Sequence, residues 1–413
     1  MKLIKKILNS SKLVVLADQA VFSGSSFAIT LLIARILSPD DFGIFTSIVL
    51  FNYLLISISN SIVIQPLQVI IAKIENRSSY LSFTFFAQAS IILLMSIITF
   101  ALLQFQVDFI KGLNSYAPGI ILFTSGFLFH DFHRKLFLAR GSVLQALIID
   151  SAAGIGQVGT FAVAYFWANF GFSEVINMMG ISYIPSLLLS IGMLKPHLKG
   201  AYEWKNYLSQ HLTQGKWLLM TSVLQWWANN LFMVASGIFL GTRALGALRL
   251  VQSFFGVLNV LLQTFENYAL PQAALLFQSS MEESKLYLRQ ISLKGSIIFG
   301  SVLLIVFLFS KEIITLGGGA EYADFGYLVK GMALLYFVIF VGYPIRMAIR
   351  MMVLNRLFFI GYVISFLFSL ISFNYLLSEW GLMGAIIGLI VNQLIILSYW
   401  QYALIKKEFI LWK

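Results

Sequence analysis

The residues with the clearest capacity for chemistry are carboxylic acids inside long apolar stretches. Asp18, Asp150 and Glu266 each lie in such a stretch. A carboxylate at the centre of a membrane costs about 2.5–3.5 kcal/mol, so it marks a functional site or is neutralised by a partner. Because protonation or cation binding neutralises the charge, Asp18 and Glu266 are candidates for coupling to H+ or Na+. Alternatively, Asp18 and Asp150 lie at the lipid headgroups beside Lys or Arg.

Basic side chains end two of the apolar stretches. His130 and Arg134 are four residues apart, as are Arg346 and Arg350, so each pair shares one helical face. Guanidinium groups bind phosphates and carboxylates through paired hydrogen bonds. These four residues and Arg140 are therefore candidates for binding a pyrophosphate or an acidic sugar. The alternative is that they are cytoplasmic charges that reach the membrane interface.

Other motifs in the sequence indicate no further chemistry. There is no cysteine, hence no thiolate nucleophile and no cysteine-ligated metal. His130, Asp131 and His133 are close in sequence, but no further ligand set accompanies them, and we predict no metal site. Residues 154–159, GIGQVG, match a dinucleotide-binding pattern, yet they lie inside an apolar helix rather than after a strand.

Amide and hydroxyl side chains recur within the first two apolar stretches of each half of the chain. Their spacing of three or four residues aligns them on one face of a helix. Such faces predict a shared aqueous cavity; the alternative is interhelical hydrogen bonding, worth about 0.6 kcal/mol per bond. The candidate cavity residues are Gln19, Ser23, Ser26, Gln65, Gln225, Asn229, Asn259 and Gln263.

Composition places all these residues in a membrane protein. The 413 residues are 59% apolar and 11% charged, with a mean hydropathy of +0.87. A soluble domain has about a quarter charged residues, so a cytosolic enzyme, a nucleic-acid binder and a disordered scaffold are excluded. Runs of about 20 apolar residues without alternation predict membrane-spanning helices rather than strands. Twelve are predicted, at 13–37, 42–72, 80–106, 116–138, 143–168, 175–194, 216–240, 244–276, 291–310, 325–348, 357–377 and 382–405.

The distribution of Lys and Arg orients these helices. With both termini in the cytoplasm, 22 of the 28 basic residues lie on the inner side, as the positive-inside rule requires. The remaining six are Arg35, Lys111, Arg243, Arg249, Lys311 and Lys330.

A polar segment divides the predicted helices into six and six. Residues 37–45, LSPDDFGIF, connect the first and second predicted helices. Residues 240–248, LGTRALGAL, connect the seventh and eighth, and the two segments share a pattern of apolar and turn-forming residues. We predict an N-terminal lobe at 1–194, a cytoplasmic linker at 195–215 and a C-terminal lobe at 216–413. The fold class is all-α integral membrane, with about twelve transmembrane helices in two six-helix lobes around a central cavity.

Residues 16–27, LADQAVFSGSSF, and 32–45, LIARILSPDDFGIF, resemble the start of Wzx-type oligosaccharide flippases; a weaker match is LARG at 138–141. That superfamily also contains the MATE multidrug antiporters and the lipid II flippases. The resemblance implies a MATE-like fold that alternates between inward-open and outward-open states. It implies translocation of an undecaprenyl-diphosphate-linked oligosaccharide for O-antigen, capsule or exopolysaccharide assembly. The relation to MATE antiporters implies that Asp18 or Glu266 couples transport to a cation gradient.

The expected protein is thus a transporter of the bacterial inner membrane, not an enzyme, without a cofactor and without nucleic acid. Its expected partners are the polyprenyl-diphosphate-linked oligosaccharide and membrane lipids, with a polysaccharide polymerase and a chain-length regulator as further candidates. One alternative is a cation-coupled multidrug or metabolite antiporter of the same fold. Another is a polytopic polymerase or glycosyltransferase, which the short predicted outer loops disfavour.

Overall fold

The computed structural model describes residues 11–71, 74–105 and 112–411. It divides into two compact units, Met1–Trp226 and Trp227–Lys413. The segment 195–215, predicted as a linker, belongs to the first unit, and the predicted lobe boundaries stay a prediction. Lys2, Lys5, Lys6, Lys73, Lys111 and Lys413, which contribute to the predicted orientation, lie outside the described residues.

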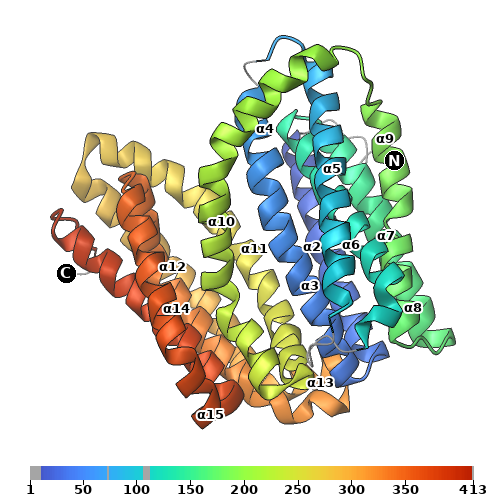
Figure 1. Cartoon of the computed structure of the whole chain (residues 1–413). Coiled ribbons are helices and arrows are strands. Elements are labelled where there is room, and N and C mark those ends of the chain that lie inside the picture. Colours follow the sequence, from blue (N-terminus) through green and yellow to red (C-terminus); the bar gives the residue numbers. More distant parts are fainter. Residues whose placement is uncertain (1–10, 72–73, 106–111, 412–413) are drawn as a thin grey trace, which may run out of the picture. The chain divides into compact units, whose positions relative to one another are not determined.

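The described part of the first unit consists of helices and the connections between them (Figure 1). The helices are α2 (Ser11–Ile36), α3 (Pro39–Ser59), the π-helix η1 (Asn60–Ile64), α4 (Gln65–Ile70), α5 (Arg77–Leu103), the 3-10 helix η3 (Leu113–Tyr116), α6 (Ala117–Ala139), α7 (Val143–Trp167), α8 (Phe172–Ile181), α9 (Ile184–Leu194), the 3-10 helix η4 (Ala201–Glu203) and the first part of α10 (Trp204–Leu240).

The second unit contains the end of α10 and the remaining helices. They are α11 (Thr242–Ser279), α12 (Met281–Leu308), α13 (Ser310–Gly318), the 3-10 helix η5 (Ala320–Phe325), α14 (Gly326–Met351) and α15 (Asn355–Ile405). Ten helical segments of the described chain are long and apolar enough to cross a membrane. A further helix of 23 residues, α6, matches one more predicted span, and α15 contains two of them. All twelve predicted spans therefore coincide with helices in their described residues; residues 72 and 106, at the ends of two spans, lie outside the described part. The all-α membrane fold is confirmed.

The break between α2 and α3 shows how the sequence ends one helix and begins the next. Ser38 caps α3: its hydroxyl accepts a hydrogen bond from the Asp41 N–H at 3.1 Å. Pro39 occupies the first turn, where its missing N–H costs nothing. Asp40 and Asp41 place negative charge at the positive end of the helix dipole. The predicted turn at residues 38–41 is therefore a helix N-terminus.

The long helix α15 is a helical hairpin. Gly381 adopts φ 53° and ψ −135°, a conformation that glycine alone adopts readily, and the chain reverses there. Positions on the two sides approach each other in antiparallel order: Asn392 donates a hydrogen bond to Ser369 at 2.7 Å, and Trp400 stacks on Phe358 at 4.9 Å. The hairpin contains the last two predicted spans.

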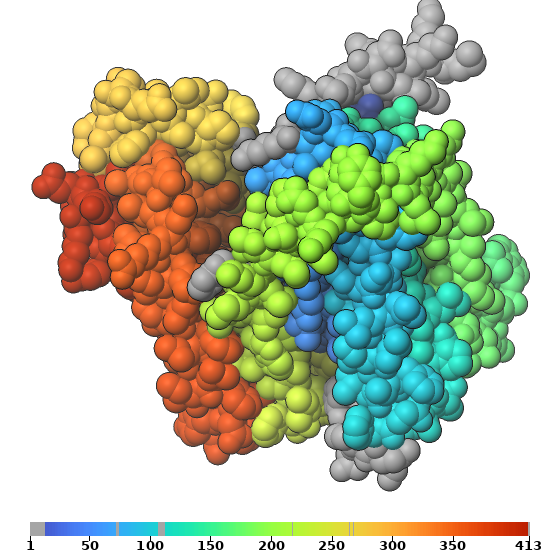
Figure 2. Space-filling view, turned by 45° about the horizontal axis from the view of Figure 1, so that its top comes forward, coloured from blue at the N-terminus to red at the C-terminus, as the bar shows by residue number. Residues whose placement is uncertain are grey.

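Several helices expose apolar side chains. Leu93 and Ile97 of α5 are 64% and 58% exposed, and Ile297 of α12 is 73% exposed. Figure 2 shows the continuous outer surface of α5 in the first unit. Soluble proteins rarely expose contiguous apolar surface of this extent, so these faces indicate contact with lipid. The protein is a multi-pass membrane protein.

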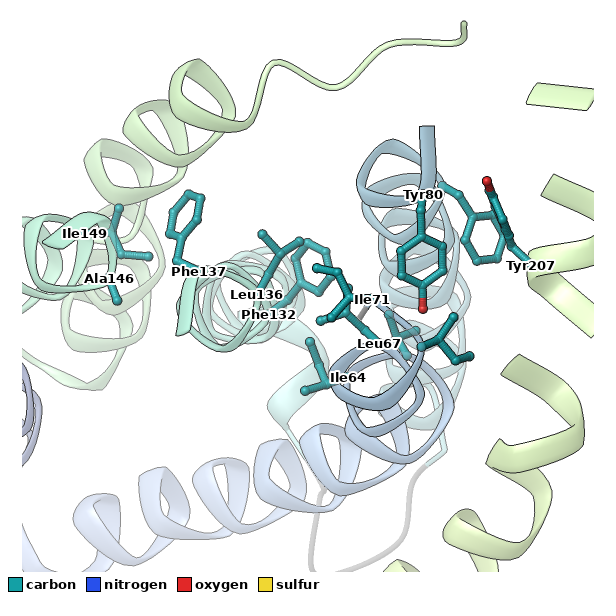
Figure 3. Packing of buried hydrophobic residues seen from close by; sticks show 13 residues of the cluster. Ile64, Leu67, Ile71, Tyr80, Phe132, Leu136, Phe137, Ala146, Ile149 and Tyr207 are labelled. Carbon is teal, nitrogen blue, oxygen red and sulfur yellow. The ribbon is translucent and has the colours of Figure 1, made fainter. Parts of the chain in front are cut away.

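The first part of α10 packs on the first unit. Tyr207 meets Tyr80 of α5 edge to face, with ring centroids 5.1 Å apart, beside a cluster of buried apolar side chains from α4, α6 and α7 (Figure 3). His211 donates through Nδ1–H to the Ile62 carbonyl at 3.0 Å and accepts from the Tyr80 hydroxyl at 2.7 Å. Pro66 has no N–H for that carbonyl, four residues before it, so His211 supplies the missing donor.

Replacing His211 by Ala is expected to cost about 1–3 kcal/mol of stability at pH 8, because two buried hydrogen-bonding groups lose their partner. Burial lowers the pKa of His211, so the folded state favours the neutral ring. As pH falls below about 6.5, the unfolded chain binds a proton that the folded chain does not, and stability decreases. Unfolding midpoints at pH 8 and pH 5 should therefore differ less in His211→Ala. His197→Ala, which removes an exposed contact to Ser78, is the control and should change the midpoint little.

Candidate functional site

A buried ionic cluster joins α2, α6, α7 and α9 of the first unit. Arg134 donates through Nε to Asp150 Oδ2 at 2.5 Å and through Nη2 to Asp18 Oδ2 at 2.8 Å. His130 Nε2 lies 3.2 Å from Asp150 Oδ1, and its Nδ1 is 2.8 Å from the Ser186 hydroxyl. Phe22 covers the guanidinium, with the Arg134 Cζ 4.0 Å from the ring centroid. The cluster thus fixes four helices to one another.

Among the residues that the structure describes, the charges of this cluster do not cancel without a further proton or cation. Asp18 and Asp150 are each 2% exposed and His130 is 7% exposed. Two carboxylates face one guanidinium, which leaves one negative charge if His130 is neutral. Asp18 Oδ1 is buried and has no hydrogen-bond partner in the described part of the chain. The arrangement can therefore accept one positive charge.

The sequence predicted separate roles for residues that the structure brings together. Arg134 and His130, predicted to bind an anion, contact Asp18, predicted to bind a cation, and Asp150. Arg140 donates to Ser142 at 3.0 Å and contacts Gln145. All three basic groups already have protein partners, and their anion-binding role stays a prediction.

A second ionic cluster lies in the second unit and has the opposite charge balance. Glu266 of α11 is 4% exposed. One of its oxygens pairs with Arg350, and the other accepts a hydrogen bond from the Tyr343 hydroxyl at 3.0 Å. Arg346 Nε is 3.9 Å from Glu266, beyond hydrogen-bond distance. With two guanidinium groups and one carboxylate, the cluster has a net positive charge.

Arg346 also lines a partly open cavity of about 270 Å³ between α10, α11, α14 and α15 of the second unit. Five amides, three hydroxyls and one guanidinium supply its polar lining, and no carboxylate is among the described residues around it. The polar residues are Asn229, Asn259, Gln263, Tyr343, Arg346, Tyr362, Ser365, Asn392 and Gln393. The apolar part includes Leu262, Leu335, Ile339, Leu389, Ile396 and Trp400.

The structure places the predicted amide residues in different surroundings. Asn229, Asn259 and Gln263 line this cavity. Gln65 lies with Gln68 and Gln214 in a shallow groove of the first unit. Gln19 donates to Ser23 at 3.0 Å on α2, Ser26 is exposed on the same helix, and Gln225 is exposed on α10. The aqueous cavity shared by both halves stays a prediction.

Sequence reasoning missed much of the cavity. Asn392 and Gln393 are adjacent amides within an apolar stretch, which is the same signal as that of the predicted amides. Tyr343 and Tyr362 carried no signal, because tyrosine is common at membrane interfaces.

Comparison with known proteins identifies the fold. No protein-family model and no curated protein matches the sequence. Among solved structures, an inward-facing multidrug resistance MATE family transporter of the MOP superfamily aligns with a TM-score of 0.72 and 12% identity over 94% of each chain. The lipid II flippase MurJ, in an inward closed conformation, aligns with a TM-score of 0.67 and 14% identity over 96% of this chain and 89% of its own. The chain has a MATE-like transporter fold.

A further solved structure is also similar to this chain in fold. A MOP superfamily transporter from Pyrococcus furiosus aligns with a TM-score of 0.56 and 12% identity over 96% of this chain and 92% of its own. At these identities the likeness concerns the fold alone, because one fold can have many functions.

Proposed function

We propose that this protein translocates a polyprenyl-diphosphate-linked oligosaccharide across the bacterial inner membrane by alternating access, for O-antigen, capsule or exopolysaccharide assembly. The observation that carries the proposal is the composition of the second unit's cavity: amides, hydroxyls and one guanidinium, with no carboxylate among its described lining residues. Amides and hydroxyls both donate and accept hydrogen bonds, as the hydroxyls of a sugar do.

The energetic need for such a lining is large. An unpaired hydroxyl costs about 4–8 kcal/mol on transfer from water into a hydrocarbon, so several sugars cross a bilayer unassisted at a negligible rate. Polar side chains within the protein replace the lost water, while the polyprenyl chain stays in lipid. An organic cation would be repelled instead, because Glu266, Arg346 and Arg350 together have a net positive charge and no carboxylate is among the described lining residues.

In this proposal, the ionic cluster of the first unit couples transport to an ion. Glu266 is neutralised by Arg350, whereas the Asp18, Asp150 and Arg134 group lacks one positive charge. We propose that this group takes up a proton on His130 or Asp18, and that the proton drives the transport cycle. Na+ in place of H+ is an outcome of the test below.

The test uses the purified protein in liposomes that contain a lipid-linked oligosaccharide in both leaflets. Membrane-impermeant periodate oxidises only sugars on the outer leaflet, so translocation is expected to expose the inner fraction. Imposed pH and Na+ gradients identify the coupling ion. The effect of the pH gradient should be lost in His130→Gln if the proton binds His130, and in Asp18→Asn if it binds Asp18. Protein-free liposomes are the control.

Two results would reject the proposal. The first is an inner fraction that stays protected while ethidium or another organic cation is transported, which would establish the multidrug antiporter. The second is normal surface polymer in a strain without this gene and without a paralogue. Glycan elongation by the purified protein would instead support an enzyme.

A further inference from the structure

We propose that the cavity of the second unit is a subsite for a single sugar ring that carries one carboxylate, and that Arg346 binds this carboxylate. The proposal rests on the proposed function for the class of cargo and adds the charge and the size of the group recognised. It follows from the charge, the unpartnered atoms and the volume of this cavity.

The two arginines of α14 have different environments. Arg350 pairs with Glu266, and the second oxygen of Glu266 is occupied by the Tyr343 hydroxyl. No oxygen of this carboxylate is left at hydrogen-bond distance from Arg346, whose Nε is buried and has no hydrogen-bond partner in the described part of the chain. Arg346, Arg350 and Glu266 together have one net positive charge. A ligand with one negative charge balances it, whereas a diphosphate has more negative charge than the site can neutralise.

Asn392 adds an acceptor to the same cavity. Its side chain is 94% buried, being 6% exposed, and its Nδ2 donates to the Ser369 hydroxyl at 2.7 Å. This bond fixes the amide with Oδ1 as its free acceptor, and Oδ1 has no partner among the described residues. A buried polar atom without a partner is costly, so a ligand hydroxyl that donates to Oδ1 is stabilised.

The remaining lining suits a sugar ring. Asn259 is held by a 2.7 Å hydrogen bond from its Nδ2 to the Tyr336 hydroxyl, and further amides and hydroxyls surround the cavity. Leu262, Ile396 and Trp400 offer apolar contact to the C–H face of a ring. The volume of about 270 Å³ is slightly below the 300–1,000 Å³ typical of sites for drug-sized ligands, which indicates one ring rather than an oligosaccharide.

Two soluble ligands test the proposal. They differ only at C6 of the sugar, where one has a carboxylate and the other a hydroxymethyl group. Methyl β-glucuronide and methyl β-glucoside are titrated against the purified full-length protein, and binding is followed by saturation-transfer NMR. The glucuronide is expected to bind about 10- to 100-fold more tightly, as one charge-assisted hydrogen-bonded contact allows.

Variants assign this preference to the cavity. Arg346→Gln should bind both ligands equally, and Arg346→Lys should retain part of the preference. Asn392→Asp places a negative charge in the cavity, which repels the negative carboxylate of the glucuronide, so this variant should not bind the glucuronide. Arg356→Gln removes an exposed arginine that does not line the cavity and is the matched control.

Several outcomes would overturn the proposal: equal binding of the two ligands, no binding of either, an unchanged preference in Arg346→Gln, or tighter binding of inorganic pyrophosphate. These outcomes are separate from failure of the proposed function. The liposome assay with a neutral lipid-linked oligosaccharide tests translocation without an acidic sugar, so translocation there together with no glucuronide preference rejects the subsite alone. Glucuronide binding without translocation rejects the proposed function alone.

Discussion

Replacing Arg134 by Met is expected to destabilise the first unit by about 3–5 kcal/mol, because it leaves Asp18 and Asp150 as buried charges without their guanidinium partner. Both carboxylates lie almost completely out of solvent. The measurement is the thermal unfolding midpoint of the purified protein in detergent. Lys135→Met removes a partly exposed pair with Asp131 on the same helix and is the matched control, with an expected loss of about 0.3–0.5 kcal/mol.

A combined variant separates loss of the ion pair from loss of packing. In Arg134→Met with Asp18→Asn and Asp150→Asn, the uncompensated charges are removed together with the guanidinium. Replacement of a whole buried ion group is often neutral, so most of the stability should return. If the triple variant is as unstable as Arg134→Met, unpaired charge is not the cause, and the role assigned to Arg134 is wrong.

Replacing Gly384 by Ala is expected to disrupt the α15 hairpin. A Cβ atom at this position would collide with the Leu376 carbonyl oxygen, a backbone atom that cannot move without displacing the preceding helix. Overpacking against side chains costs about 1–3 kcal/mol, and a backbone obstacle places the cost at or above the upper end. We expect a lower unfolding midpoint and loss of monodisperse protein on size-exclusion chromatography.

Gly300→Ala is the control for this substitution. Gly300 is also helical, but no atom of the described residues outside its own helix backbone and chain neighbours lies within 4 Å of a Cβ placed there. Because Ala favours a helix over Gly by about 1 kcal/mol, this variant should be as stable as the wild type or more stable. Equal midpoints for Gly384→Ala and the wild type would contradict the close approach of the two arms of α15.

The sequence allowed prediction of the membrane helices because that signal is local. Each run of apolar residues is long enough to span a bilayer, and the turn at Ser38 and Pro39 is encoded within four residues. Even the two arms of α15 were predicted as separate spans, since polar residues near Glu379 interrupt the apolar run.

The partners of the ionic residues were not predictable in the same way. Arg134 and Asp18 are 116 residues apart, and their contact depends on how α2 packs against α6 and α7. Helical spacing identifies residues on one face of one helix but not the face opposite. For this reason the sequence assigned Arg350 and Glu266 to different roles, although they form a pair.

The long separation within the first ionic cluster has a consequence for biosynthesis. At about 5–20 residues per second, a ribosome needs roughly 6–23 s to extend the chain from Asp18 to Arg134. During that interval Arg134 has not been synthesised, so Asp18 lacks the guanidinium group with which it pairs in the folded protein. A chain released before residue 134 would therefore leave the Asp18 carboxylate without this partner, at a cost of about 2.5–3.5 kcal/mol at the centre of the bilayer.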